Sequence, residues 1–270
     1  MELTPKLVRT STLSDFKRSG HKFSCLTSYD HLTAGIFDEA GIEVLLVGDS
    51  AADNALGYKS TLPVTVDEMI PFGRAVSSAA KRALVVIDMP FGSYEPGTET
   101  ALANGIRFMK ESGAAAVKLE GGERSAPQIK ALTEAGIPVM GHIGFTPQSV
   151  HALGGFKVQG RGDAADDVMA EALAVEAAGA FAVVLELVPA DLAAKITAEL
   201  SIATIGIGAG AHTDGQILVW TDFAGLAPGK PRKFVRQYLN LREQLLEAAK
   251  SYVSDVESKS FPNESESFAD

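Results

Sequence analysis

The chain has 270 residues, 46% of them hydrophobic and 21% charged, which excludes a disordered chain and is typical of a soluble protein with a large core. Its 24 basic and 34 acidic residues give a net charge of −10. Nucleic-acid grooves and anionic membrane surfaces require clustered Lys and Arg, so we expect a small-molecule partner, with no nucleic acid and no membrane.

The N-terminal segment and the cysteine usage both favour a cytoplasmic protein. Residues 1–20 lack the apolar segment of a signal peptide, and no uninterrupted apolar run is long enough to span a membrane. Cys25 is the single cysteine, so no internal disulfide can form. A reducing compartment is the natural expectation.

Short apolar runs rich in Val, Ile and Leu recur along the chain, each too brief for a helix. Their nearly continuous apolar character, without alternation, indicates strands that are covered on both faces, as in a parallel sheet wrapped by helices. The eight candidate strands lie within residues 23–30, 43–50, 83–90, 115–122, 137–144, 180–189, 203–210 and 215–222.

Segments with helical spacing separate most of these strands. The two clearest apolar stripes are Leu102, Ile106 and Met109 after a Thr98 cap, and Val168, Ala172 and Val175 after Asp163. A glycine stands where each of several helices is expected to end, since it adopts the left-handed conformation at little cost. These glycines are Gly41, Gly113, Gly136 and Gly179.

Eight successive strand and helix units predict an α/β fold, a closed (β/α)8 TIM barrel, with an open doubly wound sheet as the alternative. We expect a single barrel domain over residues 1–253, with a C-terminal helix over 232–250. Residues 254–270 are acidic and poor in apolar side chains, which predicts a flexible tail. The long loops 51–66 and 145–162 are candidates for functional segments.

Polar residues end six of the eight strands. In such barrels, ligands bind at the carboxyl ends of the strands. Burying a carboxylate there is costly unless a cation or hydrogen bonds compensate it. Each could instead be a separate ion pair or helix cap, but their convergence favours one common site. The residues at these ends are Tyr29-Asp30, Asp49-Ser50, Asp88, Lys118 with Glu120, His142 and Glu186.

Three of these residues predict a metal site. Asp49, Asp88 and Glu120 offer carboxylate oxygens from adjacent strands, which suits a hard divalent cation, and Mg²⁺ is preferred because no Cys or His cluster competes for zinc. Lys118 lies two residues before Glu120 and therefore points to the same side. It could bind a substrate carboxylate or stabilise an enolate, or it could form a salt bridge with one of the acids.

Two further residues are candidates for proton transfer and hydrogen bonding. Glu186 lies two strands beyond the metal group and is the candidate general base. His142 could donate a hydrogen bond to the substrate, although a single His is as often a structural residue.

Several motifs of this chain resemble the ketopantoate hydroxymethyltransferase family, in order and without large gaps from about residue 24 to 262. The VKLEGG and GHIGFTPQS segments are the most specific of them. The motifs are VGDS at 47–50, GYKSTLPVTVDEM at 57–69, DMPFGSY at 88–94, VKLEGG at 117–122, GHIGFTPQSV at 141–150, GGFKVQGRG at 154–162, and IGIGAG with DGQILVW within 205–220.

The resemblance implies a barrel of the phosphoenolpyruvate/pyruvate type with Mg²⁺. It also implies transfer of a hydroxymethyl group from 5,10-methylenetetrahydrofolate to 3-methyl-2-oxobutanoate, which yields 2-dehydropantoate in the first step of pantothenate synthesis. A homo-oligomer, commonly a decamer, is implied as well. The family's metal residues match Asp49, Asp88 and Glu120, and its base matches Glu186. Its 2-oxoacid contacts match Asp49, Ser50, Asp88 and Lys118.

Two other functions remain open from the sequence. One is a Mg²⁺-dependent C–C lyase or phosphoenolpyruvate mutase on the same type of barrel, which would turn over without folate. The other is a barrel that binds a metabolite without catalysis, or serves only as a scaffold.

Overall fold

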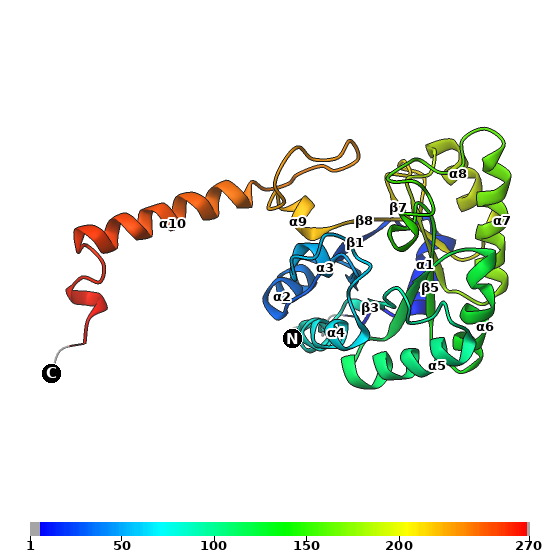
Figure 1. The fold of residues 1–270 in the computed structure, drawn as a ribbon, viewed down its shortest axis with the longest axis horizontal. Helices are drawn as coiled ribbons and strands as arrows, with labels where there is room; N and C mark the ends of the chain where they lie inside the picture. The colour runs from blue at the N-terminus through cyan, green and yellow to red at the C-terminus, as the bar shows by residue number, and fades with distance from the viewer. Residues whose placement is uncertain (1–5, 269–270) are drawn as a thin grey trace. The chain divides into compact units, whose positions relative to one another are not determined.

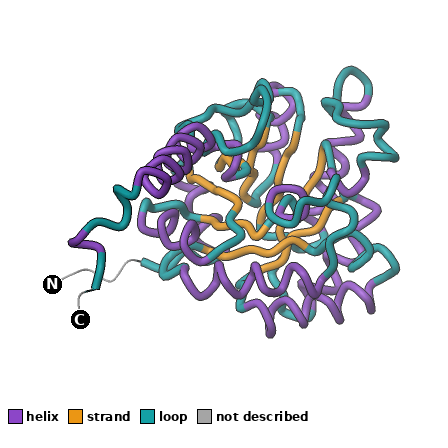
Figure 2. Tube along the Cα trace, turned by 60° about the vertical axis from the view of Figure 1, so that its left-hand side comes forward, coloured by secondary structure: helices purple, strands orange, loops and turns teal. Residues whose placement is uncertain are grey.

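The computed structural model describes residues 6–268, and within them eight parallel strands close into a barrel in chain order, β1 pairing with β8. Figure 2 shows the strands as an inner layer with helices outside them. This confirms the predicted (β/α)8 barrel and excludes the open sheet. The strands are β1 Phe23–Thr27, β2 Val44–Val47, β3 Leu84–Asp88, β4 Ala116–Glu120, β5 Val139–Gly144, β6 Ala182–Glu186, β7 Ala203–Ile207 and β8 Gly215–Leu218.

Helices precede, connect and follow the strands (Figure 1). They are α1 Thr10–Ser19, α2 His31–Glu39, α3 Ala51–Asn54, α4 Val66–Ala79, α5 Thr98–Arg107 with the π-helical turn Phe108–Ser112, α6 Ala126–Glu134, α7 Ala164–Ala177, α8 Ala190–Glu199, α9 Trp220–Phe223 and α10 Leu241–Ser258, with short 3-10 turns at Glu123–Ser125, Pro147–Ser149 and Glu264–Glu266. The four glycines expected at helix ends all have positive φ angles.

In strands β2 to β6, alternate residues belong to two different cores. In β2, Leu45 and Val47 pack in the large cluster beneath the helices, whereas Val44 and Leu46 pack in a second cluster with residues from the other strands and α1. Cys25 also belongs to this second cluster, where it packs as a small apolar side chain. A period of two therefore divides each of these five strands into a helix-facing and a barrel-facing set.

Of the two predicted apolar stripes, the one in α7 is confirmed and the one in α5 is wrong by one residue. The stripe Val168, Ala172 and Val175 is buried in α7, as expected. In α5 the stripe is shifted by one residue, because Ile106 is 44% exposed while Gly105 is buried. A Cβ on Gly105 would lie 2.5 Å from Leu132 Cδ2, so this glycine allows α5 to pack closely against α6.

The described chain divides into two compact units at residues 219 and 220, which differs from the expected single domain over 1–253. The helix expected at 232–250 begins only at Leu241. The residues before it bond to the α9 region instead of to one another, since the Tyr238 N–H donates to the Phe223 carbonyl. It continues to Ser258, so residues 254–258 are helical. Residues 1–5 and 269–270, which the domain and tail predictions include, lie outside the described range.

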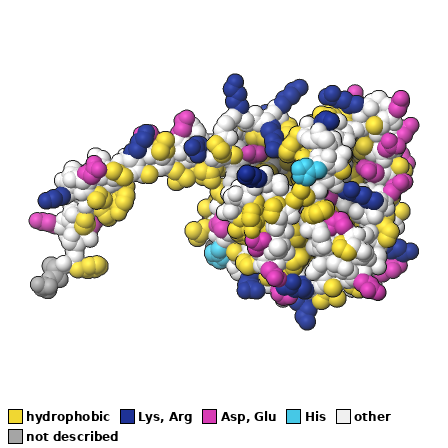
Figure 3. Space-filling view, viewed as in Figure 1, with side chains coloured by type: hydrophobic (Ala, Val, Ile, Leu, Met, Phe, Trp, Pro, Cys, Tyr) yellow, Lys and Arg dark blue, Asp and Glu magenta, His cyan; other side chains and the backbone are white. Residues whose placement is uncertain are grey.

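Helix α10 has an apolar stripe and no buried residue. Leu245, Leu246, Tyr252, Val253 and Val256 repeat at helical spacing and are all exposed. Figure 3 shows hydrophobic side chains gathered along this helix. No helix among residues 6–268 has both the length and the apolar character needed to cross a bilayer.

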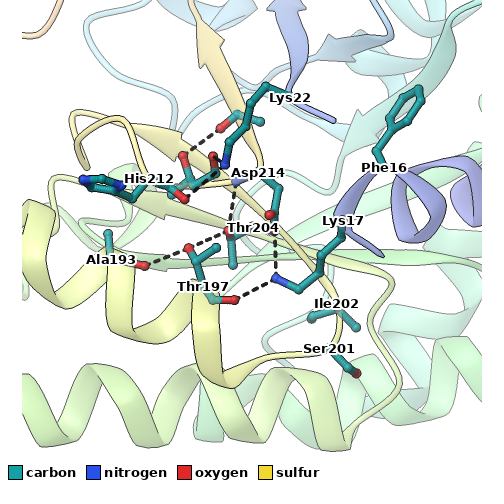
Figure 4. A network of polar contacts seen from close by, with 12 residues as sticks. Phe16, Lys17, Lys22, Ala193, Thr197, Ser201, Ile202, Thr204, His212 and Asp214 are labelled. Carbon is teal, nitrogen blue, oxygen red and sulfur yellow. Dashed lines mark hydrogen bonds and ion pairs between the residues drawn. The ribbon is translucent and has the colours of Figure 1, made fainter. Parts of the chain in front are cut away.

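A polar network joins α1 to the amino ends of the last two strands (Figure 4). Lys17 Nζ lies 2.9 Å from Asp214 Oδ2 and donates to the Thr197 carbonyl at 2.8 Å. The same Asp214 oxygen accepts from the backbone N–H of Thr204 at 2.9 Å. One lysine therefore anchors α1 to β7, β8 and α8, at the end of the barrel opposite the predicted site.

Candidate active site

In β3, β4, β5 and β6, the barrel-facing set changes from apolar to ionisable toward the carboxyl end of the strand. In β4, Ala116 lies in the barrel core, and the next two residues of the same set are Lys118 and Glu120. In the same way, Val86 is followed by Asp88 in β3, Met140 by His142 in β5, and Val184 by Glu186 in β6. Period-two alternation therefore carries these five polar side chains to one barrel mouth.

The turn after β2 adds Asp49 and Ser50. The backbone N–H of Asp49 donates to Asp88 Oδ2 at 2.9 Å, which ties this turn to the end of β3. Ser50 Oγ lies 2.6 Å from Tyr29 Oη, at the end of the neighbouring β1. The structure therefore brings Asp49 next to Asp88 and fixes Ser50 beside them.

Lys118 forms an ion pair inside this cluster. Its Nζ lies 2.8 Å from Asp88 Oδ1, and both side chains are almost fully buried. Burial disfavours the charged lysine, but Asp88, Glu120 and Asp49 outweigh it and raise the pKa of Lys118 above its ordinary value. The salt bridge that the sequence left open is thus present, and the substrate contact of Lys118 stays a prediction.

His142 lies between the lysine and the candidate base. Its Nδ1 is 3.1 Å from Lys118 Nζ, and its Nε2 is 3.2 Å from Glu186 Oε2. Burial and the Lys118 charge lower the pKa of His142, so the ring is neutral. Because an ammonium group only donates, Nδ1 accepts, and the ring proton on Nε2 faces Glu186. Both ring nitrogens thus face protein groups, and its predicted substrate contact stays a prediction.

Two of the carboxyl groups hold their protons unusually tightly. Burial, followed by the Asp88 and Glu120 carboxylates, raises the pKa of Asp49 to about 8. Burial also raises the pKa of Glu120 to about 8, although Lys118 opposes the shift. One ammonium therefore does not compensate the carboxylates gathered here, and a further cation would relieve them.

The donor chemistry of Asp49, Asp88 and Glu120 fits Mg²⁺, since all three supply carboxylate oxygens. Among the described residues, no three His, Cys, Asp or Glu side chains are arranged as they stand to hold a metal ion. In this arrangement the cation that contacts Asp88 is the Lys118 ammonium. A metal ion that binds Asp88 would therefore have to displace the Lys118 ammonium from it.

Two buried residues of the site were missed from the sequence, Tyr94 and Gln148. Gln148 Nε2 donates to Asp49 Oδ2 at 2.9 Å, and Tyr94 Oη donates to Gln148 Oε1 at 2.6 Å. Both occur in motifs that the sequence analysis singled out, DMPFGSY and GHIGFTPQSV, but neither ends a strand. Their presence in those motifs was the only sign in the sequence that could have identified them. A neutral side chain on a loop gives no electrostatic reason to select it.

Comparison with known proteins decides the family. The family model of ketopantoate hydroxymethyltransferase matches residues 7–264. The chain belongs to this family. The 3-methyl-2-oxobutanoate hydroxymethyltransferase of Leifsonia xyli subsp. xyli is 62% identical over 265 residues, which is 98% of this chain and 96% of the relative. That of Nocardioides sp. is 57% identical, over 97% of this chain and 89% of the relative. The family resemblance of the sequence motifs is confirmed, and the chain is an enzyme of the hydroxymethyltransferase class.

Two solved structures are similar to this chain in fold. A phosphonopyruvate hydrolase complex with oxalate and Mg²⁺ matches with a TM-score of 0.62 at 12% identity, over 95% of this chain and 92% of that one. A 2,3-dimethylmalate lyase of the PEP mutase/isocitrate lyase superfamily matches with a TM-score of 0.57 at 14% identity, over 96% of this chain and 91% of that one. At such low identity these matches bear on the fold alone.

Proposed function

We propose that this enzyme transfers a hydroxymethyl group from 5,10-methylenetetrahydrofolate to 3-methyl-2-oxobutanoate, giving 2-dehydropantoate and tetrahydrofolate, in the first step of pantothenate synthesis. The observation that carries the proposal is the buried cluster of Asp49, Asp88, Glu120 and Glu186 around Lys118, in a chain 62% identical to a relative named for this reaction. The cluster has the groups that forming and using an enolate of a 2-oxoacid requires.

Asp49, Asp88 and Glu120 would hold Mg²⁺. When bound, the ion supplies positive charge that stabilises the negative charge developing on the keto oxygen and so acidifies the C3 proton. Ser50, Asp49, Asp88 and Lys118 would contact the 2-oxoacid. Lys118 steadies the anionic oxygens, and Ser50, held by Tyr29, orients the carboxylate.

Glu186 removes the C3 proton of the ketoacid. It is 7% exposed and lies at the end of β6, with His142 Nε2 3.2 Å from its Oε2. The C3 electron pair then forms a bond to the methylene carbon of the folate, and both C–N bonds of that carbon break. Water supplies the hydroxyl group, and the two nitrogens of tetrahydrofolate take up the C3 proton and the remaining proton of the water. His142 Nε2 lies near this carboxylate and would help to orient it.

The decisive assay follows consumption of 3-methyl-2-oxobutanoate with and without Mg²⁺ and methylenetetrahydrofolate. We expect turnover only when both are present. Turnover without folate would instead support a C–C lyase or mutase, and a protein that binds the ketoacid without consuming it would be a non-catalytic barrel.

Replacing the base gives a sharper test. We expect Glu186→Gln to abolish exchange of the C3 proton with deuterium, measured by NMR, while Mg²⁺ and ketoacid binding persist. Glu134→Gln, the same change at an exposed position of α6, serves as the control and should exchange normally. Retained exchange in Glu186→Gln would reject Glu186 as the base.

We also propose that the enzyme is a cytoplasmic homo-oligomer, a decamer by family resemblance. The single buried Cys25 suits a reducing compartment. The exposed apolar stripe of α10 supports association, because monomers rarely leave so many large apolar side chains together on one helix face. The partner that covers this stripe would be a second copy of this chain.

A further inference from the structure

Gln148, in the loop after β5, contacts two of the three carboxylates proposed to hold Mg²⁺. Its Nε2 donates to Asp49 Oδ2 and its backbone N–H donates to Glu120 Oε2, both at 2.9 Å. These acids come from different parts of the barrel, after β2 and at the end of β4. Gln148 is 5% exposed, so water is largely kept from competing for these bonds. One residue therefore joins two carboxylates that would otherwise repel each other.

Tyr94 determines which way the Gln148 amide faces. Its hydroxyl accepts from the Glu120 backbone N–H at 3.2 Å and donates to Gln148 Oε1 at 2.6 Å. Because the hydroxyl accepts from one N–H group, its own proton is left to be donated to Gln148 Oε1. With Oε1 toward Tyr94, Nε2 must face Asp49, and its second proton goes to the Met89 carbonyl at 3.1 Å.

These contacts use one oxygen of each carboxylate. Gln148 engages Oδ2 of Asp49 and Oε2 of Glu120, which leaves Oδ1 and Oε1 outside its bonds. A group that fixes the orientation of metal-binding carboxylates is typically needed for full affinity, because it removes the cost of arranging them when the ion arrives. Tyr94 and Gln148 are placed to do this from outside the predicted ligand set.

We propose that Gln148, oriented by Tyr94, is a positioning residue that holds Asp49 and Glu120 ready for the divalent cation. This role rests on the proposed function, since it presumes that these carboxylates bind a metal. Neither residue needs to contact the ion or the substrate. Tyr94 acts on Asp49 only through the Gln148 amide, so in their effect on Asp49 the two residues should behave as one unit.

The test measures Mn²⁺ binding by electron paramagnetic resonance in the chelator-treated protein, with Mn²⁺ as an oxygen-preferring probe for the site. Gln148→Met keeps the length of the side chain and the backbone bond to Glu120, but it removes the side-chain amide that contacts Asp49. We expect it to raise the dissociation constant by about 10- to 100-fold. Tyr94→Phe removes one oxygen and should weaken binding in the same direction by a smaller factor. Its small volume change keeps the test available if Gln148→Met does not fold.

Gln128→Met is the matched control. Gln128 is partly buried and donates to the Tyr94 carbonyl at 3.4 Å without contacting any carboxylate of the site. It should bind Mn²⁺ like the unsubstituted protein. In the double variant, Tyr94→Phe should add little to the effect of Gln148→Met, because contacts within one network are not additive.

The possible failures are distinguishable. Unchanged Mn²⁺ affinity in Gln148→Met, or fully additive losses in the double variant, would overturn the positioning role while the unsubstituted protein still binds metal. An equal loss in Gln128→Met would overturn it too, because general loosening of the loops would then explain the effect. If the unsubstituted protein binds no Mn²⁺, the proposed metal chemistry fails, and this role fails with it.

Discussion

Asp49 and Glu120 link the stability of the metal-free protein to pH. Their pKa values in the folded chain are about 8, against ordinary values of 3.8 and 4.5. An acid with a higher pKa in the folded state binds more protons when folded, so the free energy of unfolding falls as pH rises between the two values. The stability contributed by these protons is thus fully present below about pH 4 and is lost progressively as pH rises toward 8.

We therefore compare the melting temperatures of the Asp49→Asn variant and the unsubstituted protein, both treated with chelator. As pH rises, the melting temperature of the variant should increase relative to that of the unsubstituted protein. Asn stays neutral at every pH, so the variant should overtake the unsubstituted protein between pH 5 and 8. The lowered pKa of His142 acts in the opposite direction in both proteins and cancels in the comparison. Melting curves of the two proteins that run parallel over this range would contradict the proposed strain at Asp49.

The ionisable residues of the site could be selected from the sequence, and the neutral ones could not. Asp88, Glu120 and Glu186 end buried strands, where a charge must have a purpose, so position and chemistry agree. Gln148 and Tyr94 lie in loops whose backbone path determines what they contact. An uncharged amide can satisfy its hydrogen bonds in many surroundings, so nothing in its position marks it before the fold is known.

Among the elements, the end of β5 controls the position of the candidate base. Gly144 has φ of +85°, and a Cβ there would lie 2.4 Å from the Glu186 carbonyl oxygen. We expect Gly144→Ala to lose about 1–3 kcal/mol of stability, since the added methyl must displace the main chain that carries Glu186. The kcat of Gly144→Ala should also fall, because Glu186 moves with the displaced main chain.

Gly136→Ala separates that displacement from simple backbone strain. Gly136 has φ of +82°, but an added Cβ would meet no atom within 4 Å. This control should lose about 1–2 kcal/mol from the left-handed conformation and keep its kcat. Equal kcat values for the two variants would show that Gly144 matters only for folding.

The α1 anchor lies at the opposite end of the barrel, so its loss should affect stability without affecting catalysis. Lys17 and Asp214 are each about nine-tenths buried. Lys17→Met leaves Asp214 without its cation and should cost roughly 2–4 kcal/mol, near the lower range for broken buried pairs. Thermal unfolding measures this loss. The exposed Lys195 of α8 provides the control, as Lys195→Met should melt normally. A lowered kcat in Lys17→Met would contradict the separation of the two ends.

Element existence could be predicted more securely than element register. The strands and the α7 stripe follow directly from apolar runs and spacing. The α5 stripe was misplaced by one residue, because Gly105 has no side chain to show in a hydrophobic pattern although its smallness is what buries it. Likewise, the late start of α10 depends on backbone bonds to α9, which are not visible from the residues between them.

At the scale of the whole molecule, closure of the barrel could be predicted because eight successive strand and helix units leave few other arrangements. The separate second unit, which begins at residue 220, could not be predicted. Its helix α10 has the apolar spacing of a core-facing helix, but none of its residues is buried. Its stripe reads as an ordinary core-facing helix in the sequence, and only the structure shows that Leu246 and Val253 are both more than half exposed.

We expect this stripe to be buried between copies of the chain, so the unsubstituted protein should sediment well above the mass of one chain. Leu246→Glu with Val253→Glu places two charges in the stripe, which should be costly to bury and should shift the protein to smaller species. Lys250→Glu changes a charge on the same helix outside the stripe and should leave the mass unchanged. An unsubstituted protein that sediments as a single chain would reject the oligomer. A double variant that keeps its full mass would show that the assembly is held by another surface, and α10 would then need a different explanation for its apolar face.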